Sequence, residues 1–297
     1  MPSVTVLLNP AAGGVHLRGP DGEIAKLFAA AGCRAEVHVL QRGHDPADAA
    51  RAASAAGSIV VAAGGDGTVS RVAAGVVEAD GTLGVLPLGT LNHFAKDLHI
   101  PLELDAAVQV VATGRIGRVD VGQVNHRVFV NNSSIGLYPS IVHVRDQLRR
   151  QGHLKWTAMA IATARVLRRY RGVRVRIDGG GRERVWRTPF VFVGNNEYTV
   201  DGINLGSRGS LDRGRLFVYL APRVRTRELP LLLLKALAGR AGRSGDFEIV
   251  SSTELRIDTR KRHRRVRVAL DGEVMKLATP LLYRTRPAAL KVMLLRA

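Results

Sequence analysis

The chain has 297 residues, of which 46% are hydrophobic and 23% charged, and it contains one cysteine. This length and apolar content suffice for one large domain or two of ordinary size. A single cysteine excludes an internal disulfide framework and the cysteine-rich zinc clusters, and the formal net charge of +19 points to an anionic partner.

The positive charge is concentrated in the second part of the chain. Residues 1–120 hold 9 basic and 12 acidic side chains, whereas residues 121–297 hold 35 and 13. This asymmetry predicts that the second part faces a polyanion, either nucleic acid or an anionic lipid surface. Because only 7 of the 44 basic residues are lysine, a compositional bias towards arginine is the alternative explanation.

The first part of the chain alternates short apolar runs with alanine-rich stretches. We expect strands at 4–8, 37–40, 59–63 and 83–88, with helices between them. Continuous apolar runs are typical of strands that are buried on both faces of a parallel sheet. The pattern therefore predicts an α/β domain whose ligand lies at the carboxyl ends of the strands.

After residue 120 the pattern changes to that of an antiparallel, β-rich domain. Two helical stretches, 138–170 and 226–240, interrupt it. The predicted domains are 1–120 and 121–285, and the tail at about 286–297 is expected to return to the first domain. The predicted strands of the second part are 119–124, 127–132, 173–177, 185–193, 216–220, 248–257, 264–270 and 290–294.

The sharpest motif is Gly64-Gly65-Asp66-Gly67-Thr68, where the third predicted strand ends and a helix at 69–77 begins. Glycines let backbone N–H groups approach an anion closely, and the helix N-terminus favours negative charge. A carboxylate among phosphates requires a divalent cation between them. Asp66 therefore predicts a Mg²⁺-nucleotide rather than a bare anion.

Two similar loops follow the first and fourth predicted strands. Their residues would meet the first motif at one edge of the sheet, where short polar side chains can reach phosphate or ribose oxygens. Taken singly, each loop is equally well explained as an ordinary turn. The predicted nucleotide-binding residues are Asn9, Pro10, Gly13, Gly64, Gly65, Asp66, Gly67, Thr68, Gly89, Thr90 and Asn92.

In this order and spacing, NPxxG, GGDGT and PxGTxN resemble the diacylglycerol kinase catalytic family, which includes sphingosine kinases and bacterial lipid kinases. Asp120-Val121-Gly122, Gly194-Asn195-Asn196 and Asp271-Gly272-Glu273 also resemble motifs of that family. The resemblance implies an ATP-binding α/β domain like those of phosphofructokinases and NAD kinases, and a C-terminal antiparallel β-sandwich that takes the lipid. It also implies an active site between the two domains.

The segment Asp271-Gly272-Glu273, here called the DGE turn, carries the candidate catalytic carboxylates together with Asp66. Asp-Gly alone is a strong hairpin-turn signal, and a simple turn is the more economical reading of these residues. The resemblance instead implies that Glu273 accepts the proton of the attacking hydroxyl and that Asp271 contributes to base or metal function. Asp120 is a weaker candidate as a carboxylate near the metal, with Asp66 as the main one.

The chain departs from the family pattern at several positions. Ser70 and Arg71 stand where Asn-Glu is usual, and Leu40 replaces a threonine. His93 stands where aspartate often follows Asn92. Arg213 interrupts the turn in which bacterial members bind a second, structural Mg²⁺, and so argues against that site here.

The segment 138–176 is basic and amphipathic, with Trp156 suited to a membrane interface. A helix packed on the sandwich with a solvated charged face would look the same in sequence. A second such stretch lies at 226–240.

We expect an ATP- and Mg²⁺-dependent kinase of a membrane lipid, diacylglycerol-like, in the cytoplasm and peripherally bound to the inner face of the membrane. No signal peptide or bilayer-spanning run is evident. The β-rich domain could form a homodimer. The alternatives are a kinase of a soluble substrate such as NAD, a pseudokinase and a nucleic-acid-binding protein, the last motivated by the basic run at 260–265 but lacking a reading motif.

Overall fold

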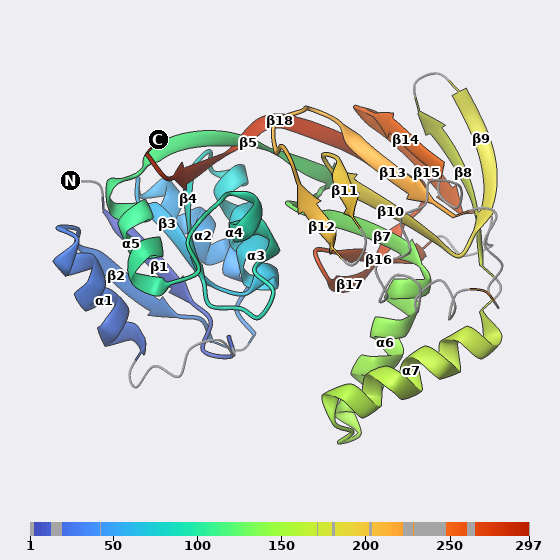
Figure 1. Cartoon of the computed structure of the whole chain (residues 1–297), viewed down its shortest axis with the longest axis horizontal. Coiled ribbons are helices and arrows are strands. Elements are labelled where there is room, and N and C mark those ends of the chain that lie inside the picture. The colour runs from blue at the N-terminus through green and yellow to red at the C-terminus, as the bar shows by residue number, and fades with distance from the viewer. Residues whose placement is uncertain are drawn as a thin grey trace.

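The computed structural model describes residues 3–12, 20–41, 43–170, 172–179, 182–201, 204–221, 228, 248–259 and 265–296. Two bodies of different architecture lie side by side, and two long strands run between them (Figure 1). The predicted helix at 226–240 and most of the basic run at 260–265 lie outside the described residues, except Glu228 and Arg265.

The first body is built on a parallel sheet with the strand order β2-β1-β3-β4. Its two central strands are continuous buried apolar runs, as expected of strands covered on both faces. The edge strand β2 begins two residues before the predicted run 37–40 and ends one residue earlier, and it is more exposed than the central strands because only one side of it is paired. The strands are β1 (Val4–Leu8), β2 (Ala35–Val39), β3 (Ile59–Gly64) and β4 (Thr82–Pro87).

In the described part of the first body, five helices connect and cover these strands. Helices α2 and α3 pack with their backbones in close contact, because a Cβ on Gly75 would lie 2.1 Å from the carbonyl oxygen of Ala47. This packing fixes the axis of α3, the helix that follows the Gly-Gly-Asp-Gly-Thr motif. The helices are α1 (Pro20–Ala30), α2 (Pro46–Ala55), α3 (Asp66–Glu78), α4 (His93–Asp97) and α5 (Leu104–Thr113).

The second body is an antiparallel β-sandwich. One layer has the order β14-β13-β10-β7-β16-β17, and the other contains β15, β8, β9 and parts of β18 and β5. Buried side chains from both layers, such as Val193 and Ile257, form one apolar core. A separate two-stranded ribbon, β11–β12, lies beside the sandwich.

The strands of the second body are listed here in chain order. They are β5 (Arg115–Val124), β6 (Arg127–Phe129), β7 (Asn132–Gly136), β8 (Val173–Gly179), β9 (Arg182–Thr188), β10 (Phe190–Asn195), β11 (Tyr198–Asp201), β12 (Asn204–Arg208), β13 (Leu216–Leu220), β14 (Glu248–Ser252), β15 (Glu254–Thr259), β16 (Arg265–Leu270), β17 (Glu273–Ala278) and β18 (Leu281–Leu294).

The two bodies share hydrogen-bonded sheet. Strand β18 pairs antiparallel with β15 at its start and parallel with β4 at Lys291 and Val292, and it pairs with β5 along most of its length. The end of the chain thus adds a strand to the first sheet. The predicted boundary at residue 120 falls inside β5, which belongs to both bodies.

Three predicted strands are each divided in two, for different reasons. The run 127–132 breaks because the N–H groups of Val130 and Asn131 and the carbonyl of Val130 bind side chains instead of a neighbouring strand. The run 185–193 breaks at Pro189, which has no N–H for a ladder. The run 248–257 breaks at Thr253, where the chain crosses from one layer of the sandwich to the other.

The predicted helical stretch 138–170 consists of two helices, α6 (Leu137–Arg150) and α7 (Lys155–Arg169). They form a hairpin that extends away from the sandwich (Figure 1). A small apolar cluster around Leu148, Ala158 and Ala162 holds the two helices together. Most of the outer surface of the hairpin is therefore free of packing within the described chain.

Candidate active site at the domain junction

The Gly-Gly-Asp-Gly-Thr motif forms the turn from β3 into α3, as the sequence predicts. Gly65 is the N-cap of α3 and supplies no side-chain hydrogen bond to the first turn. The N–H groups of the first turn of α3 therefore receive no cap from the side chain of residue 65, and the positive end of the helix dipole lies at the same place. Both features favour an anion at the start of α3.

The three predicted loops meet at one edge of the parallel sheet. The register pairs Leu8 with Ala63, and Gly64 with Pro87, so the chain leaves all three strands at the same level. A Cβ on Gly89 would lie 2.4 Å from the Cα of Gly65. Glycine at position 89 therefore allows two of the loops to touch backbone to backbone.

Asn9 and Asn92 hold these loops in place. The side-chain amide of Asn9 donates to Thr68 Oγ1 at 2.8 Å and its carbonyl accepts from the backbone N–H of Ala11. Asn92, in a left-handed conformation with φ 51°, accepts the N–H of Gly89 and donates to the carbonyls of Pro87 and Gly89. Both asparagines therefore shape the loops before any nucleotide binds.

Most of the remaining predicted loop residues are either exposed at the sheet edge or buried beneath it. Pro10 and Thr90 are exposed at the same edge, while Gly64 and Thr68 are buried beneath it. Gly13 lies outside the described residues. The loop edge thus presents backbone and small side chains over a rigid base.

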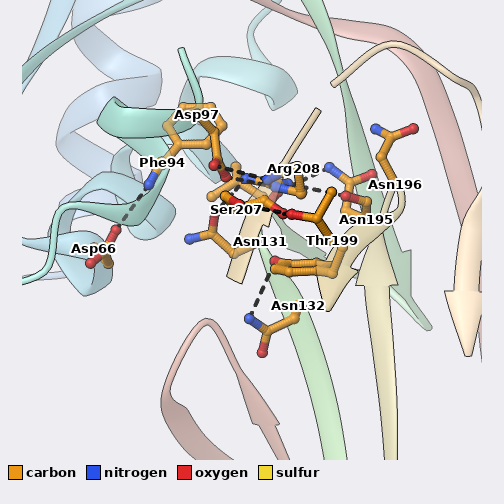
Figure 2. A network of polar contacts seen from close by, with 12 residues as sticks. Asp66, Phe94, Asp97, Asn131, Asn132, Asn195, Asn196, Thr199, Ser207 and Arg208 are labelled. Carbon is orange, nitrogen blue, oxygen red and sulfur yellow. Dashed lines mark hydrogen bonds and ion pairs between the residues drawn. The ribbon is translucent and has the colours of Figure 1, made fainter. Parts of the chain in front are cut away.

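Asp66 is the first residue of α3 and points towards α4. Its Oδ1 accepts the backbone N–H of Phe94 at 3.2 Å (Figure 2). Within the described ranges, no group of three or more His, Cys, Asp or Glu side chains is placed to hold a metal ion.

Asp120, the second predicted metal residue, is buried at 2% exposure. Its Oδ2 accepts from the backbone N–H of Gly214 and the side chain of Asn196, and its Oδ1 accepts from the backbone N–H of Ala288. Both oxygens are occupied by protein donors. These contacts give Asp120 a structural role, joining β5, β18 and the turn before β13, and its metal role stays a prediction.

The DGE turn closes the hairpin between β16 and β17, so the turn reading of Asp-Gly is correct for its backbone. Asp271 and Gly272 both have positive φ, 45° and 89°, as a two-residue hairpin loop requires. Yet the Asp271 carboxylate is not at the surface. Its pKa is raised by burial, against the opposing effect of the hydrogen bonds that it accepts.

Asp271 is surrounded by donors from both bodies. It accepts the backbone N–H groups of Val130, Asn131 and Asn132 at 2.8–2.9 Å. The hydroxyl of Ser70, on α3 of the first body, donates to its Oδ2 at 2.5 Å. With both oxygens accepting hydrogen bonds, Asp271 holds the turn in position, and its base or metal function stays a prediction.

Glu273 is the carboxylate of the DGE turn that reaches the Gly-Gly-Asp-Gly-Thr motif at residues 64–68, here called the glycine loop. Its side chain is 40% exposed, and its Oε2 accepts a hydrogen bond from Nε of Arg71 at 2.9 Å. Its Oε1 lies 3.8 Å from the position that a Cβ on Gly67 would occupy. The structure therefore brings the predicted proton acceptor to the predicted phosphate loop across the junction.

Sequence reasoning missed Arg208, which lies at the end of β12 and is fully buried. It forms an ion pair with Asp97 of α4 at 2.8 Å and donates to the carbonyl of Val130 and to Oδ1 of Asn131, both at 2.7 Å (Figure 2). The segment 130–132 is thus held by Arg208 through the carbonyl of Val130 and the side chain of Asn131, and by Asp271 through its three N–H groups.

This polar network connects the two halves of the site. Asp97 and Phe94 belong to the same short helix, α4, and Phe94 in turn contacts Asp66 (Figure 2). A chain of contacts therefore runs from the glycine loop through α4, Arg208 and segment 130–132 to Asp271. No sequence motif marks Arg208, because its partner Asp97 lies 111 residues away.

Comparison with known proteins agrees with this architecture. The sequence model of the diacylglycerol kinase catalytic domain matches residues 3–124, and that of the YegS C-terminal NAD kinase beta sandwich-like domain matches residues 136–294. Together they cover both bodies. The chain belongs to the diacylglycerol kinase catalytic-domain family, with a YegS-type C-terminal domain, which confirms the predicted family and fold class.

Among curated proteins, the diacylglycerol kinase of Staphylococcus saprophyticus is 31% identical over 134 residues, which are 44% of this chain and 44% of that protein. That of Staphylococcus epidermidis is 38% identical over 91 residues, 30% of this chain and 29% of that protein. The matched segments thus span less than half of these relatives.

A crystal structure described as a diacylglycerol kinase from Bacillus anthracis aligns with a TM-score of 0.71 and 20% identity, over 98% of this chain and 96% of that chain. At this identity the likeness establishes the shared fold.

Proposed function

We propose that the protein is an ATP- and Mg²⁺-dependent kinase that transfers the γ-phosphate of ATP to the hydroxyl of a membrane lipid of the diacylglycerol type. The observation that carries the proposal is the position of Glu273, whose Oε1 faces Gly67 of the glycine loop. Phosphoryl transfer needs a phosphate cradle and a carboxylate that receives the proton of the attacking hydroxyl.

The glycine loop fits a nucleotide phosphate chain. A Cβ on Gly64 would lie 2.7 Å from Thr68 Oγ1, and one on Gly89 would lie 2.4 Å from the Cα of Gly65, so glycine at both positions lets the loops pack closely at the start of α3. The N-terminus of a helix favours an anion. We assign phosphate contacts to the backbone of Gly65 and Gly67 and to Thr90. ATP supplies the phosphoryl group when bound.

Asp66 is the residue that we assign to Mg²⁺. Magnesium in kinases usually keeps phosphate oxygens and waters as most of its ligands and takes only one or two carboxylates from the protein, so Asp66 would suffice as the protein ligand. The contact of Asp66 with Phe94 fixes the carboxylate at the mouth of the loop.

On the acceptor side, Glu273 takes the hydroxyl proton, and Asp271 keeps the turn in register with segment 130–132. The proton needs only one carboxylate oxygen. Oε1 is the oxygen that faces the loop, whereas Oε2 is held by Arg71. Because Arg71 binds one oxygen and leaves the other facing the loop, the carboxylate is oriented as a base before the acceptor binds.

We further propose that the α6–α7 hairpin binds the anionic inner face of the membrane from the cytoplasm. Trp156 and Leu154 at its tip are 82% and 76% exposed. Asp146 is the one acidic residue of the two helices, and it pairs with Arg145. Exposed apolar side chains among cations fit an anionic lipid surface. The exposed basic residues are Arg149, Arg150, Lys155, Arg165, Arg168 and Arg169.

The hairpin does not have to cross the bilayer for this. In the described part of the chain, no helix is both long and apolar enough to span a membrane. Each basic residue close to an anionic surface contributes roughly 1 kcal/mol, so a cluster of them gives useful recruitment.

The kinase proposal is tested by the transfer of label from γ-labelled ATP, with Mg²⁺, into a panel of lipid alcohols in anionic vesicles. NAD, as a soluble acceptor, is assayed in parallel. We expect label in one lipid class and loss of transfer in both Glu273→Gln and Asp66→Asn. Label in NAD alone would replace the lipid proposal by the soluble one, and label in nothing despite ATP binding would indicate a pseudokinase.

The membrane proposal is tested by co-sedimentation with vesicles of anionic and of zwitterionic lipid. We expect the double variant Leu154→Ala/Trp156→Ala to bind anionic vesicles at least several-fold more weakly than the wild type. Ile249→Ala, which removes an apolar side chain of 54% exposure on β14, is the matched control. Equal losses in the two variants would exclude the hairpin as the docking surface.

A further inference from the structure

Helix α3 contacts the DGE turn through two neighbouring residues, Ser70 and Arg71, which depart from the family pattern. Ser70 donates to Asp271 and Arg71 donates to Glu273. The contacts join residues that are 201 and 202 positions apart in the chain and lie in different bodies. Both departures therefore meet at the same turn.

The two contacts act on different carboxylates. Asp271 is buried and already accepts three backbone N–H groups, so Ser70 adds a fourth donor to a group that is fixed without it. Glu273 is half exposed, and Arg71 is the residue that binds its side chain in the described structure. The orientation of Glu273 thus depends on Arg71 far more than that of Asp271 depends on Ser70.

Arg71 is itself held from the other side. Its Nη1 lies 3.7 Å from Oδ1 of Asp45, the N-cap residue of α2, while Nε binds Oε2 of Glu273. The guanidinium is planar, so anchoring one edge of it at Asp45 directs its Nε edge. Arg71 is therefore placed by the first body and acts on the second.

We propose that Arg71 is a positioning residue for Glu273. It fixes Oε2, so that Oε1 remains turned towards Gly67 and available to the acceptor hydroxyl. This inference rests on the proposed function, because it concerns the carboxylate that receives the proton. It assigns no contact between Arg71 and the lipid or the nucleotide.

The test compares turnover of the wild type with that of Arg71→Ala, Arg71→Lys and Arg51→Ala. Arg51 is the matched control, since it lies on α2, is 47% exposed against 45% for Arg71, and binds Glu78 at 2.6 Å. We expect Arg71→Ala to lower kcat on the order of 10- to 100-fold with the KM for ATP within about threefold, as for loss of orientation. Arg71→Lys should recover part of the rate, and Arg51→Ala should match the wild type.

A double-mutant cycle separates positioning from direct phosphate binding. In the Glu273→Gln background, Arg71→Ala should cost less than about threefold, because Arg71 acts through Glu273. An equal loss in both backgrounds, a higher kcat for Arg71→Ala, or a change confined to the KM for ATP would each overturn the inference. If the wild type transfers phosphate and Arg71→Ala has a normal kcat, the positioning role of Arg71 is refuted and the kinase proposal stands. If the wild type transfers no phosphate, the kinase proposal itself is refuted.

Discussion

A buried ion pair of Arg208 and Asp97 links the two bodies. Their side chains are 0% and 4% exposed. Replacing Arg208 with methionine keeps much of the volume but leaves a buried carboxylate and three acceptor oxygens without a cation. Removing one partner of a buried pair costs about 3–5 kcal/mol, and we expect a loss of unfolding free energy in that range.

The assay is urea-induced unfolding followed by circular dichroism, for Arg208→Met, Asp97→Asn and the double variant. In the double variant the stranded charge is gone, so its loss should be smaller than the sum of the single losses by roughly 1–3 kcal/mol. Arg256→Met is the control, since Arg256 pairs with Asp258 at 54% exposure, and it should cost less than about 1 kcal/mol. Additive losses, or a loss for Arg208→Met no larger than that of the control, would refute the interdomain role.

Three further predictions follow from individual contacts. Gly89→Ala places a Cβ 2.4 Å from Gly65 Cα, so it should weaken ATP binding on the order of 10-fold, measured by calorimetry. Gly209→Ala is the control, because a Cβ there meets open space, and equal ATP affinities of the two variants would contradict the loop contact. Asp120→Asn should lower the unfolding free energy by about 1–3 kcal/mol, because an amide cannot accept all three N–H groups; a Tm equal to that of the wild type would exclude the structural role. The pKa of His143 in the folded protein is lowered by burial and by the positive charges of Arg267, Lys276 and Arg150, and Asp146 opposes this effect. As the pH falls below about 6.5, the unfolded chain therefore binds the proton before the folded protein does, and the folded protein loses stability. The wild-type Tm should therefore fall more than that of His143→Gln between pH 7.5 and 5.5, and parallel curves would count against this.

The positions of the glycine-containing loops could be predicted because they depend on short stretches of neighbouring residues. Apolar runs mark buried strands, glycines mark the turns after them, and parallel strands bring their carboxyl ends to one edge. That logic places Asn9, Gly65 and Gly89 together without any knowledge of the second body. It could not show that Asn9 and Asn92 bond to their own loops, since this depends on the final course of the backbone.

The junction could not be predicted in the same way. Asp271 looks like a turn residue in sequence, and its burial depends on segment 130–132, which is about 140 residues earlier. Strand β17 was missed because its residues alternate only weakly between buried and exposed. In sequence, Ser70 and Arg71 are visible only as departures from the family pattern, and their partners, the carboxylates of the DGE turn, lie 201 and 202 residues away.

The central claim is that the glycine loop binds the nucleotide and that Glu273 acts on the acceptor. The most direct measurement is of ATP binding and of phosphoryl transfer on the same preparation of Glu273→Gln, beside the wild type. We predict ATP affinity within about threefold of the wild type together with a loss of transfer of at least 100-fold, as expected for a missing general base. Undiminished transfer by Glu273→Gln would contradict the account, as would a loss of ATP binding large enough to explain the loss of transfer.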